Sequence, residues 1–236
     1  MSELIIIISA SWLAGIAAFA GGLGAKFEGT ANTEQKRELI HGVVAFGGGI
    51  LTAAIAFALI PQAISTLPTT GLATTFCLGG LVFCALDAYL NRRGGSKAQF
   101  MAMLMDFIPE AIALGALFGH NHKAGKLLAL FIGAQNLPEG FNSFREITTS
   151  GTSSRSALWG LFGISLLGPV AACSGHFWLQ NQPMLTAGIM SFAAGGILYL
   201  IFQDIAPQST MRKHWLPPLG AVLGFAVGMI GKQLLG

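Results

Sequence analysis

Charged residues are scarce in this sequence. Lys and Arg together number 13 and Asp and Glu number 10 among 236 residues, so 10% of the chain is charged. A soluble domain carries about 25% charged residues, and this chain has too few to cover a water-soluble globule. Because 53% of its residues are hydrophobic, the sequence predicts that a lipid bilayer surrounds it. No nucleic-acid partner is expected, because the net charge of +3 is spread over loops without a basic stripe.

Cysteine is also scarce, and the motifs of common enzyme classes are missing. The three cysteines, Cys77, Cys84 and Cys173, lie in apolar runs, where a free thiol behaves as a small hydrophobe. The sequence contains no His-Glu-x-x-His run, no Gly-x-Ser-x-Gly elbow and no phosphate-binding loop. We therefore expect neither a disulfide framework, nor an enzyme, nor a prosthetic group.

Long apolar runs, in contrast, are abundant. Crossing a hydrocarbon core of about 30 Å takes roughly 20 apolar residues in a helix, whereas a strand of an outer-membrane barrel takes about 10 alternating residues. The runs here have the helical length, and we predict an all-α polytopic membrane protein with a single transmembrane domain over residues 1–236. The first run lacks a basic segment before it and a cleavage signal after it, so it is predicted to be a retained helix. Charged and Gly/Pro-rich segments separate the apolar runs and predict eight helices, at about 3–23, 40–64, 71–91, 98–119, 124–148, 156–180, 184–206 and 214–235.

Lys and Arg are distributed unevenly between the connections of these helices. Lys and Arg in short loops resist translocation, so the connections that hold most of them are predicted to be cytoplasmic. The connections after helices two, four and six hold only Lys123 and Lys126. Both termini are therefore expected outside, and the compact chain leads us to expect a bacterial inner membrane. The connections after helices one, three, five and seven hold Lys26, Lys36, Arg37, Arg92, Arg93, Lys97, Arg145, Arg155, Arg212 and Lys213.

The second and seventh predicted helices share a motif. The run Gly48–Leu51 precedes Pro61-Gln62, and the matching run Gly195–Leu198 precedes Pro207-Gln208, with a spacing that differs by one residue. Even- and odd-numbered helices run in opposite directions, so the two copies would be inverted repeats, as in many secondary transporters. The alternative is a chance match, because Gly-Gly pairs are common in membrane helices.

Polar residues interrupt the fourth and fifth predicted helices. The fourth contains Asp106 and Glu110, two carboxylates on one helix face, beside a proline that frees a backbone carbonyl. The fifth contains a second Pro-Glu pair, Pro138-Glu139, within a polar stripe. Placing a charged side chain at the bilayer centre costs at least about 2.5–3.5 kcal/mol. Three carboxylates at this depth therefore indicate that these residues serve a function of the protein.

Divalent metal binding is the function that these residue types favour. Carboxylate and amide oxygens suit hard or borderline divalent cations, and carbonyls freed by proline can add ligands. The alternatives are protonated carboxylates that join the helices, or a proton-coupled carrier of a small organic solute that uses the same carboxylates. Asp87 and Glu146 lie near predicted helix ends and are expected to be solvated, while Asp204 and the adjacent Gln203 stay open between an interfacial and a packing position. The predicted metal ligands are Asp106, Glu110, Gln135, Asn136 and Glu139.

Together these features resemble the ZIP (Zrt/Irt-like) family of divalent-metal transporters. The resemblance rests on eight helices with both ends outside, the Pro-Glu motif of helix four, the run Asn136–Gly140 and the shared motif of helices two and seven. It implies uptake of a divalent metal toward the cytoplasm, with Zn²⁺, Mn²⁺, Fe²⁺ and Cd²⁺ as candidate cargo. It also implies a homodimer and an elevator-like motion, in which helices one, four, five and six move past helices two, three, seven and eight.

The resemblance also implies ligands residue by residue. Helix four of the family usually reads His-Asn-x-Pro-Glu-Gly, and its ligand positions match Asp106, Phe107 and Glu110 here. Helix five of the family supplies a Gln or His, an Asn or Asp, and a Glu. Those positions match Gln135, Asn136 and Glu139, which are intact.

Three departures from the family pattern bear on the substrate. Asp106 replaces an imidazole ligand, and an oxygen-rich shell moves preference from zinc toward Mn²⁺ or Fe²⁺. Phe107 and Gly168 replace ligands of the family's second metal position, so one main site is expected. Gln62 and Gln208 stand where the family often has Glu, which implies a less acidic exit path.

Overall fold

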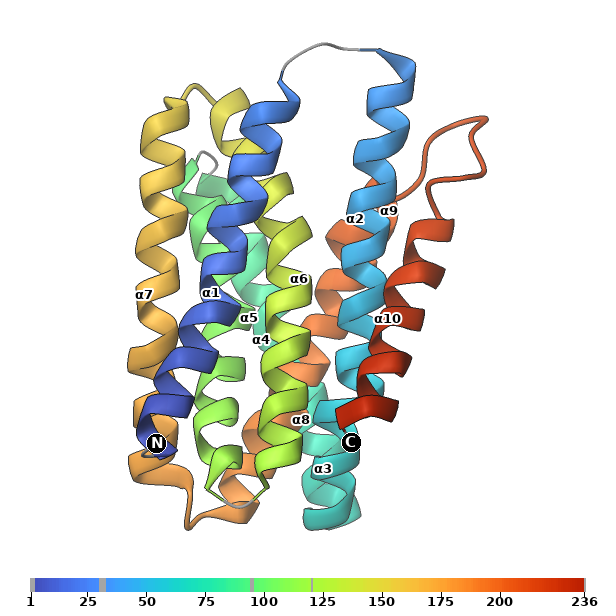
Figure 1. Cartoon of the computed structure of the whole chain (residues 1–236). Helices are drawn as coiled ribbons and strands as arrows, with labels where there is room; N and C mark the ends of the chain where they lie inside the picture. The colour runs from blue at the N-terminus through green and yellow to red at the C-terminus, as the bar shows by residue number, and fades with distance from the viewer. Residues whose placement is uncertain (1–2, 30–32, 94–95, 120, 236) are drawn as a thin grey trace.

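The computed structural model describes residues 3–29, 33–93, 96–119 and 121–235, and nearly all of them are helical (Figure 1). This agrees with the predicted all-α class; the described residues hold no strand, only an isolated bridge between Met211 and His214. Two helices continue through a π-helical turn, α2 through η1 into α3 and α8 through η2 into α9. The elements are α1 (Glu3–Glu28), α2 (Glu34–Ala54), η1 (Ile55–Leu59), α3 (Ile60–Thr66), α4 (Thr69–Arg93), α5 (Ser96–Phe118), α6 (His122–Thr149), α7 (Ser154–Leu179), α8 (Pro183–Leu200), η2 (Ile201–Ile205), α9 (Ala206–Gln208) and α10 (Leu219–Leu235).

Five helical segments of the described chain are long and apolar enough to cross a membrane. These segments indicate an integral membrane protein. The last helix, α10, is apolar but has only 17 residues. Helix α6 falls outside the five, and it carries the polar stripe that contains Gln135 and Glu139. The five segments are Glu3–Glu28, Glu34–Thr66, Thr69–Leu90, Ser154–Leu179 and Pro183–Gln208.

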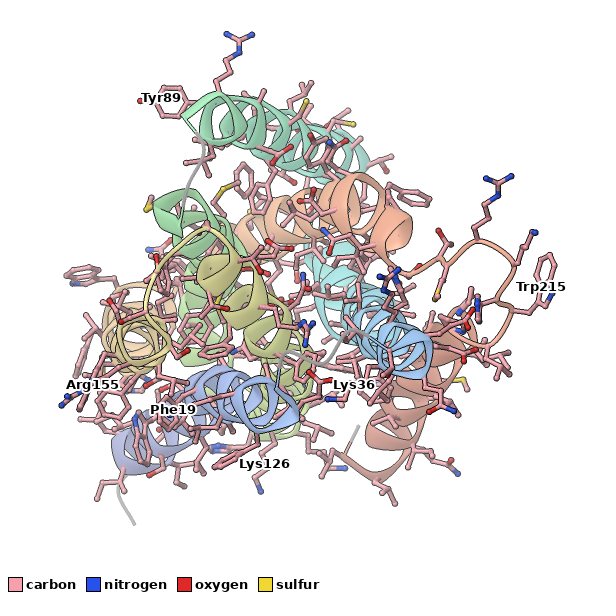
Figure 2. The ribbon with its side chains drawn as sticks, turned by 90° about the horizontal axis from the view of Figure 1, so that it is seen from above. Phe19, Lys36, Tyr89, Lys126, Arg155 and Trp215 are labelled. Carbon is pink, nitrogen blue, oxygen red and sulfur yellow. The ribbon has the colours of Figure 1, made fainter. Side chains whose placement is uncertain are left out.

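The helices pack in two groups (Figures 1 and 2). Helices α1, α5, α6 and α7 form what we call the first bundle, in which α1 and α5 each pack against both α6 and α7. Helices α2, α4, α8 and α10 form the second bundle, in which α2 packs against α10 and α4 against α8. The two bundles meet chiefly where α2 contacts α6 and α5 contacts α8.

Glycines allow the closest helix contacts within each bundle. A Cβ atom at Gly21 of α1 would lie 1.9 Å from the carbonyl oxygen of Leu137 in α6. In the second bundle, a Cβ atom at Gly224 of α10 would lie 2.1 Å from the carbonyl oxygen of Phe46 in α2. Small residues let membrane helices approach until their backbones touch, and packing of this kind holds helices together in lipid.

The two π-helical turns occupy equivalent places. Element η1 ends two residues before Pro61, and η2 ends two residues before Pro207. The N–H of Ile60 reaches back to the carbonyl of Ile55, and the N–H of Ala206 reaches that of Ile201. Because proline has no N–H and its ring clashes with the carbonyl four residues earlier, a widened turn accommodates it. Helices α2 and α8 run in opposite directions, so the shared feature occurs in both orientations (Figure 1).

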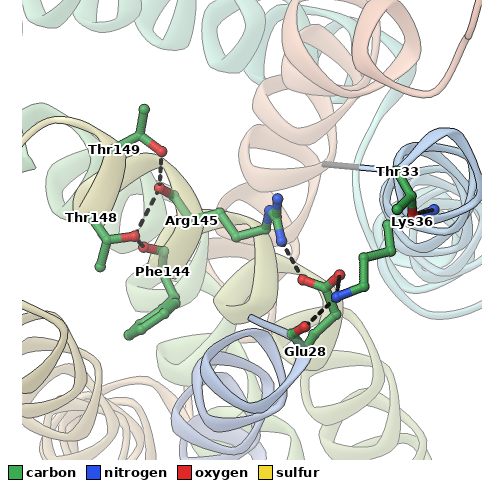
Figure 3. Close-up of polar contacts among 7 residues, drawn as sticks. All are labelled: Glu28, Thr33, Lys36, Phe144, Arg145, Thr148 and Thr149. Atoms are coloured by element: carbon green, nitrogen blue, oxygen red, sulfur yellow. Dashed lines mark hydrogen bonds and ion pairs between the residues drawn. The ribbon is translucent and has the colours of Figure 1, made fainter. Parts of the chain in front are cut away.

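An ion-pair cluster joins the bundles at the end of the molecule opposite both chain termini (Figures 1 and 3). Glu28, at the end of α1, accepts a hydrogen bond from Arg145 of α6 at 2.5 Å. The ammonium of Lys36 in α2 lies 3.3 Å from the same carboxylate. Thr33 caps α2 by accepting the N–H of Lys36 at 3.3 Å. Glu28 therefore connects one helix of the second bundle to two of the first.

Candidate metal site

Helix α5 places two carboxylates in the protein interior. Asp106 is 5% exposed and Glu110 is 0% exposed. They lie four residues apart and so share one face of the helix. Pro109 lies between them, and its missing N–H removes the donor that the carbonyl of Met105 would have in a regular helix. Asp106 accepts a hydrogen bond from the N–H of Phe107 at 2.8 Å.

Helix α6 places amide groups against this face. Gln135 is fully buried and donates from Nε2 to Oε2 of Glu110 at 2.7 Å, which joins the two helices. Asn136 is also buried, but its Nδ2 donates to the carbonyl of Ala14 in α1 at 2.9 Å. The structure thus brings Glu110 and Gln135 into contact and directs the amide nitrogen of Asn136 toward α1.

Three oxygens of the predicted ligands lack hydrogen-bond partners among the described residues. They are Oε1 of Glu110, Oε1 of Gln135 and Oε1 of Glu139. The carboxylates of Asp106, Glu110 and Glu139 are also close enough to repel one another. Buried polar atoms are normally paired, and unpaired buried charge is costly. A cation between α5 and α6 would satisfy the free oxygens and offset the repulsion.

The carboxylates alone do not make a metal cluster. In the part of the chain that the structure describes, no three His, Cys, Asp or Glu side chains are spaced to hold a metal ion. An ion held here would therefore take amide or backbone oxygens besides the carboxylates. Gln135 offers one such oxygen, and the missing N–H of Pro138 frees the carbonyl of Ala134.

A cavity of about 280 Å³ opens between the two bundles. Asp106 and Glu139 line it, whereas Glu110, Gln135 and Asn136 are not part of its lining. The cavity also reaches η2 and α9, at the end of the molecule opposite both termini (Figure 1). Its other polar lining residues are Asp87, Asn142, Ser143, Glu146, Asp204 and Gln208.

Two acidic residues that the sequence predicts to be solvated lie in the cavity wall. For Asp87 that prediction was wrong: it is 9% exposed and accepts the hydroxyl of Tyr199 at 3.0 Å, because α8 packs over α4. Glu146 is partly buried and accepts Nδ2 of Asn142 at 3.0 Å. The sequence did not predict the burial of these two residues, because burial near a helix end depends on which other helix packs against it.

Gln208 gives the cavity an amide, as expected, but carboxylates also line this part of the cavity. Oε1 of Gln208 accepts Nδ2 of Asn142 at 3.1 Å. Asp204, four residues earlier in η2, is partly buried and adds a carboxylate to the lining. Gln62 also stands where the resembled family often has Glu. It does not line the cavity.

Phe107 packs inside the first bundle. Its ring is buried against Gly15 of α1 and Gly168 of α7, where an added Cβ atom would lie 2.9 Å and 2.7 Å from the ring. The residue that matches a second metal position in the resemblance is thus an apolar contact between three helices. The expectation of a single main site stays a prediction.

The fold and the site define an integral membrane protein of packed helices, with an acidic cavity between two bundles. No family model matches the sequence. Over 110 residues the chain is 33% identical to the zinc transporter GufA of Myxococcus xanthus. The shared segment covers 46% of this chain and 43% of that protein, so the chain spans under half the length of the relative that it matches.

Proposed function

We propose that this chain transports a divalent transition-metal ion across the membrane toward the cytoplasm. The ion is held by carboxylate and amide oxygens between α5 and α6. The observation that carries the proposal is the set of buried oxygens without donors on Glu110, Gln135 and Glu139, beside a cavity that Asp106 and Glu139 line. Three interacting carboxylates inside a membrane bundle mark an ion pathway or a proton relay.

The similarity to GufA favours the ion pathway. That protein is named a zinc transporter, and it is 33% identical over the shared segment. The similarity supports metal transport in general, and the residues at the site refine the choice of ion. An oxygen-rich shell with Asp106 in place of an imidazole favours Mn²⁺ or Fe²⁺, with Zn²⁺ and Cd²⁺ as further candidates.

The proposed direction follows from charge. The cavity leads to the end of the molecule where α2 begins and α6 ends (Figure 1), the segments that contain Lys36 and Arg145, and short basic connections face the cytoplasm. Asp87, Glu146 and Asp204 then give the departing ion successive oxygen ligands. Eight spans, both termini outside, a bacterial inner membrane and a homodimer stay predictions of this proposal.

The arrangement of helices supports an elevator-like motion. If α2 to α3 and α8 to α9 each count as one helix, the helices of the first bundle (α1, α5, α6 and α7) are the first, fourth, fifth and sixth in the chain. This bundle holds all five predicted ligands. The helices of the second bundle (α2, α4, α8 and α10) are the second, third, seventh and eighth. Two antiparallel helices of this bundle, α2 and α8, continue into matching π-helical turns, which favours inverted repeats. Moving the first bundle along the second would carry the ligands between the two sides of the membrane.

Metal uptake into proteoliposomes tests the proposal. The experiment compares wild type, Glu139→Ala and the control Glu34→Ala with Zn²⁺, Mn²⁺, Fe²⁺ and Cd²⁺; the Glu34 side chain is 74% exposed. We expect saturable uptake of at least one ion, a loss of at least about tenfold in Glu139→Ala, and wild-type uptake in Glu34→Ala.

Absence of flux for all four ions in a folded preparation would contradict the proposal. Equal flux in wild type and Glu139→Ala would contradict the site. Flux of an organic solute that depends on pH and not on metal would instead identify a proton-coupled carrier.

A further inference from the structure

The ion-pair cluster at the end opposite both termini combines a contact within the first bundle with a contact between the bundles (Figure 3). Glu28 of α1 and Arg145 of α6 both belong to the first bundle, and Arg145 donates to Oε2 of Glu28 at 2.5 Å. Lys36 belongs to α2 of the second bundle, and its ammonium lies 3.3 Å from Oε1 of Glu28. The same ammonium donates to the backbone carbonyl of Glu28 at 2.5 Å. Of the two cations beside Glu28, Lys36 is therefore the one that lies across the bundle boundary.

Helices α1 and α6 are packed closely enough to move as one unit. Their backbones touch, because a Cβ atom at Gly21 of α1 would lie 1.9 Å from the carbonyl oxygen of Leu137 in α6. Arg145 therefore stays beside Glu28 if the first bundle moves. The side chain of Glu28 is 13% exposed, and a buried carboxylate that loses all its partners is costly. Since Arg145 remains, the contact between Glu28 and Lys36 can open and close without leaving the carboxylate unpaired.

Farther along α2, the contact between the bundles is apolar. A Cβ atom at Gly47 of α2 would lie 3.0 Å from Cγ of Pro138 in α6. Apolar contacts have no preferred direction, so such surfaces can slide, whereas hydrogen bonds and ion pairs depend on distance and direction. A shift of one helical turn is about 5.4 Å, which would take Glu28 out of contact with Lys36. Sliding of the bundles must therefore open this ion pair.

A second polar contact between the bundles lies in the wall of the acidic cavity. Nδ2 of Asn142 in α6 donates to Oε1 of Gln208 in α9 at 3.1 Å, and both residues line the cavity. Asp106 and Glu139 line the same cavity, which reaches the end opposite the termini. The two polar contacts thus hold the bundles in an arrangement in which two predicted ligands face that end.

We propose that Glu28 and Lys36 form a latch, which holds the first bundle where the acidic cavity reaches the end opposite the termini. The latch opens when the first bundle moves along the second, and Arg145 then remains as the partner of Glu28. The two cations have different roles: Arg145 positions the carboxylate within its own bundle, and Lys36 binds it from the other. This inference rests on the elevator-like motion of the proposed function.

Distances between two spin labels, one on each bundle, test the latch in lipid nanodiscs without metal. Arg155→Cys in α7 and Thr210→Cys after α9 carry the labels, because both residues are exposed, in a protein without its three native cysteines. The labelled protein is compared with its Lys36→Gln and Arg145→Gln variants. Each substitution removes one cation from Glu28, so Arg145→Gln is the matched control. We expect Lys36→Gln to raise the fraction of molecules at a second distance by about two- to fivefold, and Arg145→Gln not to raise it.

Salt provides a measurement that needs no substitution in the latch. The Debye length falls from about 10 Å at 0.1 M to about 3 Å at 1 M, so 1 M NaCl should raise the fraction at the second distance in the labelled protein. The rise should be smaller in Lys36→Gln, which has no latch to weaken. If Lys36→Gln does not fold, the salt response of the labelled protein decides, and its absence would overturn the proposal.

Two further outcomes would overturn the latch. One is the same distance distribution in all three proteins. The other is an equal rise of the second distance in Lys36→Gln and Arg145→Gln, which would show that the charge on Glu28, and not its contact across the bundles, sets the arrangement. The distances are measured without metal, so a failure of uptake in proteoliposomes would contradict the proposed function and leave this result separate.

Discussion

Glu110 and Gln135 form the most deeply buried polar contact among the predicted ligands. Both are 0% exposed, and Nε2 of Gln135 lies 2.7 Å from one oxygen of Glu110. The second oxygen of Glu110 has no donor among the described residues. A buried carboxylate with one partner is costly in its ionised form, and a bound cation offsets that cost. A bound cation is therefore expected to stabilise the protein at this residue.

Glu110→Gln should remove the response of the protein to metal. The amide keeps an acceptor for Gln135 and, like a protonated carboxyl group, carries no charge, so the free energy of unfolding without metal should change by less than about 1 kcal/mol. Bound metal stabilises a folded protein by mass action, and that gain should disappear. Thermal unfolding in detergent with and without Mn²⁺ measures both effects.

Glu34→Gln is the control for this comparison, because the Glu34 side chain is 74% exposed and does not line the acidic cavity. Its response to Mn²⁺ should resemble that of wild type. A Glu110→Gln protein that Mn²⁺ still stabilises to the wild-type extent would show that Glu110 is not a ligand.

At the scale of elements, the contact between α1 and α6 positions the site. A Cβ atom at Gly140, next to Glu139, would lie 2.0 Å from the carbonyl oxygen of Ala18. The backbones of the two helices touch at this point, and Asn136 one turn earlier donates to the carbonyl of Ala14. Helix α1 thus sets the position of α6 although it contributes no predicted ligand.

Gly140→Ala should therefore destabilise the protein by about 1–3 kcal/mol, because the added methyl group forces the two helices apart. Gly133→Ala is a control on the same helix, since a Cβ atom there would lie 3.5 Å from Cα of Ala14, an ordinary contact. Thermal unfolding of both variants measures the difference. Equal melting temperatures would show that the α1–α6 contact is not as close as described.

The sequence predicted chemistry along single helices better than contacts between them. The i, i+4 spacing of Asp106 and Glu110 follows from helix geometry, and the structure buries both. Asp87 was missed, because its burial depends on α8, whose Tyr199 lies 112 residues away in the chain. The cavity that α1, α2, α6 and the start of α10 line was also missed, since no run of residues marks a space between four segments.

The ends of two helices differ from those predicted from the charged, glycine and proline residues between the apolar runs. Helix α2 begins at Glu34 and not at about residue 40, because Thr33 caps a polar first turn. Helix α10 begins at Leu219 and not at about residue 214. Pro217 and Pro218 come just before it, and proline is tolerated only in the first turn of a helix, so the helix does not start earlier. Lys213, with φ of 67°, adds a turn in the preceding loop.

For the whole molecule, the distribution of charge predicts the orientation in the membrane. Exposed Lys126 lies in the first turns of α6, at the end where both termini lie, and exposed Lys213 lies at the opposite end (Figure 1). Cysteine substituted for each, in a protein without its three native cysteines, reports the side. Lys126→Cys should react with a membrane-impermeant maleimide in intact cells, and Lys213→Cys only after permeabilisation. The reverse pattern would contradict the proposed direction of transport.

We propose that the transported metal ion passes between α5 and α6 in contact with Asp106. The decisive measurement is the ratio of Zn²⁺ to Mn²⁺ uptake in proteoliposomes, compared between Asp106→His and wild type, because misfolding lowers flux but does not improve selectivity for one ion. An imidazole ligand favours Zn²⁺ over Mn²⁺, so the ratio should rise in Asp106→His. An unchanged ratio with flux retained would show that the ion does not contact this residue, and no flux in folded wild type would contradict metal transport itself.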